Sequence, residues 1–170
     1  TAAEVGKAKI ESLLNERVKR KNLSEEEKNK LLGNVKTLSS LEKISGSDLV
    51  IEAVFEDLEL KHSLYKKIEP HLKKNAILAS NTSTLPITKL SEALQEGTRF
   101  IGIHFFSPVE RMNLVEIIKS KQSNEKSLAV ALDYVSLLKK TPIVVNDSRG
   151  FYANRCIIPY INEGLRMLNE

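Results

Sequence analysis

One histidine lies where its ring could act as a general acid or base. His104 is near the end of the apolar run FIGIHFF, just before a Ser-Pro pair, and it is one of only three histidines in 170 residues. An imidazole gains or loses its proton near neutral pH, which suits it to accept the proton of a reacting hydroxyl group. A histidine satisfied by hydrogen bonds inside the core fits the same pattern, so the residue alone leaves both interpretations open.

Polar residues also follow two other apolar runs. Glu56 comes directly after DLVIEAVF, and the run Asn81–Ser83 comes directly after AILAS. In open parallel sheets, ligands bind in the crevice beyond the carboxyl ends of the strands, so these positions are candidates for a binding site. A solvated helix start at Glu56, and an ordinary turn with helix capping at the Ser and Thr residues, explain the same residues without a ligand.

The apolar pattern around these positions alternates between helices and strands. Helical spacing and capping residues predict helices over 2–20, 24–33, 59–72, 88–94, 125–138 and 152–169. Apolar runs predict strands over 35–40, 48–55, 75–80, 100–105, 114–118 and 142–145, with the 48–55 strand buried on both faces. Strands separated by helices imply crossover units, so we expect an α/β fold with a mainly parallel sheet.

Four stretches of the sequence form an ordered set of motifs. They are DLVIEAVFEDLELK, ILASNTSTLPI, HFFSPVERMNLVEII and TPIVVNDSRGFYANRCIIPY. The set resembles 3-hydroxyacyl-CoA dehydrogenases, and most closely the dehydrogenase part of multifunctional fatty-acid β-oxidation proteins. The likeness is strong from Asp48 to Glu163 and weak over 1–45. It implies a Rossmann-like sheet, NAD as cofactor, and oxidation of the 3-hydroxyl group of an acyl-CoA to a ketone.

The resemblance also implies roles for four residues. By motif position His104 is the base, and Glu116 in LVEII is the carboxylate that fixes its tautomer and stabilises the imidazolium. A carboxylate inside an apolar strand is costly unless it is paired, which gives this pairing a physical reason. Ser83 and Asn154 match positions that hydrogen-bond the substrate's hydroxyl and keto oxygens beside the nicotinamide.

Further ligand contacts follow from the same resemblance. Positions that match the surroundings of the cofactor are Ala53, Glu56, Lys61, Asn81 and Ser83. Positions that match contacts with the CoA nucleotide, on a looser alignment, are Ser12 and Lys19.

The glycine-rich turn of a dinucleotide-binding unit does not occur in the sequence. The seven glycines lie at 6, 33, 46, 97, 102, 150 and 164, so G-x-G-x-x-G is absent. We therefore predict a partial NAD-binding domain over 1–148 without its first two strands, followed over 149–170 by the first helix of a helical domain. In the strand order 3-2-1-4-5-6 this leaves two interior edges unpaired. Such a chain is not expected to be active alone, and an inactive remnant with a structural or oligomerisation role is the alternative.

Composition excludes other classes of protein. The net charge is +4, but acidic runs interrupt the basic ones and only 5% of residues are aromatic, which disfavours nucleic-acid binding. No stretch reaches the roughly 20 apolar residues of a membrane span, the N-terminus lacks the apolar core of a signal peptide, and the single Cys156 forms no internal disulfide. We expect a cytoplasmic protein, or a mitochondrial matrix protein in a eukaryote, that binds an acyl-CoA. It is expected to form a homo-oligomer or to be part of a larger polypeptide.

Overall fold

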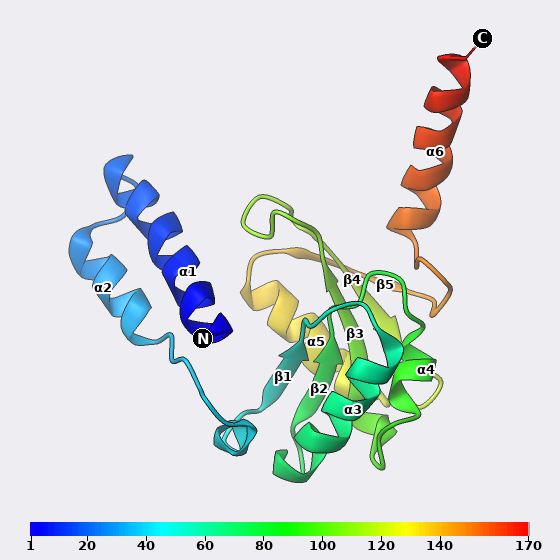
Figure 1. Ribbon diagram of the computed structural model, residues 1–170, viewed down its shortest axis with the longest axis horizontal. Helices are drawn as coiled ribbons and strands as arrows, with labels where there is room; N and C mark the ends of the chain where they lie inside the picture. The colour runs from blue at the N-terminus through cyan, green and yellow to red at the C-terminus, as the bar shows by residue number, and fades with distance from the viewer. Residues whose placement is uncertain (170) are drawn as a thin grey trace. The chain divides into compact units, whose positions relative to one another are not determined.

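The computed structural model describes residues 1–169, which form two compact units divided between Lys43 and Ile44. The first unit is a helical hairpin of α1 (Ala2–Lys19) and α2 (Glu25–Gly33) (Figure 1). Both helices begin with a capping box, in which Thr1 and Ser24 exchange hydrogen bonds with the glutamate three residues later. Neither helix contains a buried residue, so capping and local side-chain contacts, rather than a core within the hairpin, define it.

The second unit contains a five-stranded sheet. Its strands, in spatial as well as chain order, are β1 (Leu49–Glu52), β2 (Ile77–Ser80), β3 (Phe100–Phe105), β4 (Leu114–Lys119) and β5 (Thr141–Val145). All neighbours are parallel except β3 and β4, which are antiparallel. The predicted α/β class and mainly parallel sheet are therefore confirmed.

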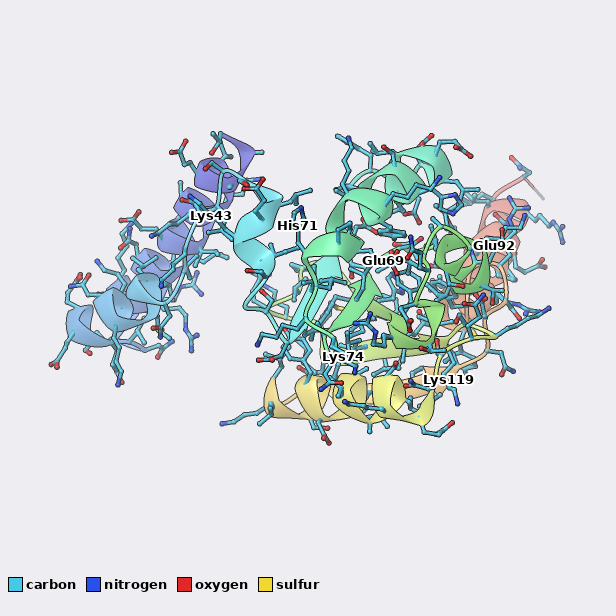
Figure 2. All side chains as sticks on the ribbon, turned by 90° about the horizontal axis from the view of Figure 1, so that it is seen from below. Lys43, Glu69, His71, Lys74, Glu92 and Lys119 are labelled. Carbon is cyan, nitrogen blue, oxygen red and sulfur yellow. The ribbon has the colours of Figure 1, made fainter. Side chains whose placement is uncertain are left out.

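Helices cover both faces of this sheet. Figure 2 shows α5 (Glu125–Leu137) along one side and α3 (Leu58–Ile68) with α4 (Ile87–Ser91) on the other. Successive strand residues point to opposite faces, so Leu78 packs in the cluster of α3 and α4 whereas Ile77 packs in the cluster of α5. Each fully buried aliphatic or aromatic side chain contributes about 1.5–3 kcal/mol, and the two clusters hold the carboxyl ends of the strands at fixed positions.

Several predicted strands differ from the structure. Residues 35–40 form no strand, because a strand needs a hydrogen-bonded neighbour and none is available to this segment in its own unit. The strand predicted over 48–55 is shorter, and it is not buried on both faces: Leu49, Val50 and Ile51 are half-buried because β1 lies at the edge of the sheet. Within the described residues, β1 to β5 are consecutive neighbours, so the sheet has no interior gap and its unpaired edges are the outer sides of β1 and β5.

The chain ends in α6 (Ala153–Met167), close to the predicted helix over 152–169. A tight turn leads into it, in which Gly150 and Phe151 both have positive φ, at 76° and 52°. No residue of α6 is buried, and its exposed apolar residues include Ile157, Ile161 and Leu165. Among residues 1–169, no helix has the length and apolar character needed to cross a membrane.

Candidate active site

His104 and Glu116 form a buried pair across the antiparallel strands. They are direct partners in the register of β3 and β4, and directly opposite side chains in such a ladder lie close enough to touch. His104 Nδ1 lies 2.7 Å from Glu116 Oε2. The two residues are only 4% and 0% exposed. The contact predicted between these two side chains is therefore present.

The second oxygen of Glu116 binds the start of α6. Oε1 accepts hydrogen bonds from the backbone N–H groups of Tyr152, at 2.9 Å, and Ala153, at 2.8 Å. Three donors thus offset the cost of burying this carboxylate. A charged carboxylate accepts the proton of Nδ1, which leaves Nε2 as the unprotonated nitrogen of a neutral His104.

The free nitrogen of His104 remains reachable from solvent. No described residue hydrogen-bonds Nε2, yet none of the fully buried side-chain nitrogens and oxygens in residues 1–169 lacks a partner. Nε2 is therefore not fully buried. The ring is fixed from the sides by Phe106 and Phe151, whose centroids lie 4.6 and 5.9 Å from its own. This arrangement holds a proton acceptor at the surface of an otherwise buried ring.

Ser83 and Asn154 lie together at the same edge of the sheet. Asn154 Nδ2 donates to the backbone oxygen of Ser83 at 3.1 Å. Asn154 directly follows Ala153, whose N–H group Glu116 binds, so one set of contacts joins all four predicted catalytic residues. Ser83 Oγ and Asn154 Oδ1 make no hydrogen bond to any described residue and are available to a ligand.

Glu56 organises the turn that contains Ser83. Its Oε1 accepts from Thr82 Oγ1 (2.6 Å), Ser83 N (2.8 Å), Thr84 N (2.9 Å) and Thr84 Oγ1 (3.1 Å). Desolvation works to raise the pKa of Glu56, but the hydrogen bonds from Thr82, Thr84 and Ser83, with the charge of Lys61, outweigh it and lower the pKa below its usual value. Glu56 therefore stays charged while it holds this turn.

The other predicted cofactor residues occupy the same edge but differ in exposure. Asn81 Oδ1 accepts from Phe105 N at 2.9 Å, which ties the end of β2 to the end of β3 beside His104. Ala53 is exposed directly after β1. Lys61, in contrast, is only 1% exposed and pairs with Glu52 at 2.7 Å. Its role at the cofactor stays a prediction.

Ser12 and Lys19 lie on α1, in the first unit, where both are exposed and Lys19 pairs with Glu16 at 2.9 Å. Their contact with a CoA nucleotide stays a prediction, as does the domain boundary between 148 and 149.

The sequence did not identify several buried residues that hold this edge of the sheet in place. They are Glu52, Tyr65 and Ser80, all buried. Glu52 carried a usable signal, because it is a glutamate within the apolar run LVIEAVF and a buried carboxylate must find donors. Glu116 in LVEII carries the same signal.

Comparison with known proteins finds one matching family and many relatives. A family model described as "3-hydroxyacyl-CoA dehydrogenase, NAD binding domain" matches residues 1–148. The fatty acid oxidation complex subunit alpha of Shewanella amazonensis is 41% identical over 158 residues, which are 93% of this chain and 22% of that protein. The chain thus spans about a fifth of the length of this curated relative.

Solved structures agree with this match. The (S)-3-hydroxybutyryl-CoA dehydrogenase PaaH1 of Ralstonia eutropha superposes with a TM-score of 0.95 at 38% identity, covering 99% of this chain and 59% of the other. FadB2 of M. tuberculosis superposes with a TM-score of 0.93 at 32% identity, covering 98% and 59%.

Proposed function

The chain belongs to the family of 3-hydroxyacyl-CoA dehydrogenase NAD-binding domains, and we propose that the protein containing it oxidises 3-hydroxyacyl-CoA to 3-oxoacyl-CoA in fatty-acid β-oxidation. The observation that carries this proposal is the 2.7 Å contact between His104 Nδ1 and the buried Glu116, with Nε2 left free. Oxidation of a hydroxyl group needs a base for its proton, and this pair supplies one.

Each residue of the pair has a defined part in the reaction. His104 accepts the hydroxyl proton at Nε2 as the carbonyl forms, and the ring becomes positively charged. Glu116 stabilises that charge through Nδ1–H, while its two backbone donors keep it from turning away. Ser83 Oγ and the remaining amide hydrogen of Asn154 are donors for the substrate oxygen on which the carbonyl develops.

The residues at this edge fit one end of NAD. Directly after β1, the apolar residues Val54 and Phe55 are exposed, Phe55 to 86%, at the strand's carboxyl end where a nucleotide ring binds in such sheets. Together with Ala53, Glu56 and Asn81 they are suited to surround the nicotinamide portion, and bound NAD supplies the acceptor for the hydride. The pyrophosphate portion has no matching glycine-rich turn in the 170 residues.

Substitution of His104 tests the proposed activity. In the longer protein, His104→Ala should lower the rate of 3-hydroxyacyl-CoA oxidation, followed by NADH formation, by roughly 100-fold or more, the effect expected of a general base. His71→Ala is the matched control, because this second histidine lies in a short helix away from the pair, and it should leave the rate unchanged. A His104→Ala rate within a few-fold of wild type would remove the proposed role.

A second candidate is a catalytically inactive remnant with a structural or oligomerisation role; the 170 residues by themselves do not contain G-x-G-x-x-G. A chain without the phosphate-binding turn lacks charge-assisted hydrogen bonds worth about 1.5–3 kcal/mol each. NADH titrated to millimolar concentration against the 170-residue chain should then change neither its fluorescence nor the melting temperature of the chain. Saturable binding would instead show that the chain holds the cofactor by itself.

The relatives' names also suggest partners. We propose an acyl-CoA substrate and, because the relative from Shewanella amazonensis is a subunit of a complex, membership of a larger multifunctional polypeptide or an oligomer.

A further inference from the structure

A second buried carboxylate lies at the carboxyl end of β1. Glu52 is 4% exposed, and its Oε1 accepts from Lys61 Nζ at 2.7 Å and from Val54 N at 2.6 Å. Its Oε2 accepts from Tyr65 Oη at 2.6 Å and from Ser80 Oγ at 2.8 Å. Glu52 therefore connects β1, α3 and β2 through donors on all sides.

Tyr65 donates to this carboxylate as a neutral phenol. Burial, with the hydrogen bond to Glu52, raises the pKa of Tyr65 far above its usual value, so the hydroxyl group keeps its proton. The ring of Tyr65 also packs on Phe100, with centroids 5.2 Å apart. Both oxygens of Glu52 are occupied by donors, so the cluster offers no free acceptor to a reacting proton.

Lys61 extends the cluster toward the candidate active site. Besides Glu52, its Nζ lies 3.2 Å from Val54 O and 3.5 Å from Glu56 Oε2. Glu52 and Lys61 together thus hold both the N–H and the C=O of Val54, two residues before Glu56. Since Lys61 is buried and its ammonium group makes these three contacts, the group is occupied.

Glu56 carries this connection to Ser83. One of its oxygens faces Lys61, and the other accepts the backbone N–H groups of Ser83 and Thr84. A continuous set of polar contacts therefore runs from the buried carboxylate of Glu52, through Lys61 and Glu56, to the turn that contains Ser83. A buried ion pair is a weak source of stability, since apolar residues of similar volume often replace it at no cost, so stability alone does not account for this one.

We propose that Glu52 and Lys61 are positioning residues, which hold Glu56 and through it fix the backbone of Ser83 at the edge of the site. Lys61 acts on the cofactor and substrate region through Glu56. This inference rests on the proposed function for its catalytic meaning, because Ser83 is placed there beside the reacting oxygen.

Hydrogen exchange of the backbone amides in this chain tests the inference without an activity assay. The double variant Glu52→Gln, Lys61→Met removes both buried charges, while the introduced glutamine keeps polar partners for Tyr65 and Ser80, so the fold should survive. We expect the amides of Ser83 and Thr84 to exchange about tenfold faster or more, with the amides of β3 and β4 unchanged. Glu56→Gln should give the same local change.

Asp147 provides the matched control. It accepts the backbone N–H groups of Ile87 and Thr88, each at 2.7 Å, at the next turn of the chain. Asp147→Asn should raise exchange at these two amides and leave Ser83 and Thr84 protected.

Two outcomes would overturn the inference. In one, Ser83 and Thr84 keep their protection in the double variant, so the pair does not position the turn. In the other, exchange rises equally in all strands, so the pair only stabilises the fold. The proposed function fails separately, if His104→Ala leaves the oxidation rate intact, whatever the exchange shows.

Discussion

Glu116 and Glu52 are two buried carboxylates on strands of the same sheet, and they differ in what their partners can still do. Both accept several hydrogen bonds, and both are almost completely excluded from solvent. Glu116 binds a histidine whose other nitrogen stays free, whereas Glu52 binds an ammonium and a phenol whose contacts are complete. A buried carboxylate thus supports proton chemistry only where its partner keeps one unoccupied site that solvent or substrate can reach.

The largest expected effect is a difference in unfolding free energy between variants that remove the partner of Glu52 and variants that remove the partner of Glu116. Lys61→Met leaves Glu52 charged and buried without its ion-pair partner, so we expect the free energy of unfolding to fall by about 3–5 kcal/mol. His104→Gln should cost less, because Glu116 keeps two backbone donors and an amide can replace the ring nitrogen. Urea denaturation of both variants measures the difference. Equal losses of unfolding free energy would mean that Glu52 and Glu116 depend equally on their side-chain partners.

Glu116→Gln tests whether the Glu116 carboxylate is needed for His104 to act as a base. The introduced glutamine can keep accepting from Tyr152 and Ala153 only by turning its amide NH₂ toward His104, which then carries its proton on Nε2 and is no longer a base. We expect roughly a 100-fold loss of oxidation rate in the longer protein, with little change in stability.

Nitrogen NMR of the His104 ring in this chain reports the same change directly. The tautomer should switch from Nδ1–H to Nε2–H. An unchanged tautomer together with a lost rate would show that Glu116 acts by charge rather than by orientation.

A third experiment tests whether the strand that carries His104 is held by packing. A Cβ atom added at Gly102 would lie 2.8 Å from Ile87 Cδ1 and 3.0 Å from Ile118 Cβ, so Gly102→Ala should destabilise the fold by about 1–3 kcal/mol. Gly33→Ala is the control, since nothing lies within 4 Å of its added Cβ, and it should not destabilise. Thermal unfolding compares the two. If Gly102→Ala left the stability unchanged, packing against α4 would not be what fixes the position of β3.

The smallest effect concerns Glu56, which joins the Glu52 cluster to the Ser83 turn. Because its pKa is lowered from 4.5 on folding, Glu56 contributes stability above pH 4.5 that is lost as the pH falls through the folded pKa. The contribution should be no more than about 1 kcal/mol, since the carboxyl group is partly exposed and water screens it. Urea denaturation between pH 5 and pH 3 should show a shallower loss for Glu56→Gln than for wild type, and parallel curves would contradict this.

The sequence was informative where a pattern has a local cause. The helices and five of the six predicted strands follow from apolar spacing and capping residues, and the contact between His104 and Glu116 follows from a motif that places them on paired strands. The segment 35–40 has the composition of a strand, but composition does not supply a neighbour to pair with. The partners of Glu52 could not be read from the chain, because Tyr65 meets it only when α3 packs against the sheet and Ser80 only when β2 pairs with β1.

One oxygen of Glu116 binds the ring of His104 and the other binds the first turn of α6, so the two events share a single carboxylate. If protonation of the imidazole changes the free energy with which the first turn of α6 binds Glu116, then binding of α6 changes the free energy of protonation by the same amount, because such couplings are reciprocal. Displacing α6 and protonating the His104 ring are therefore two ways of measuring the same coupling free energy.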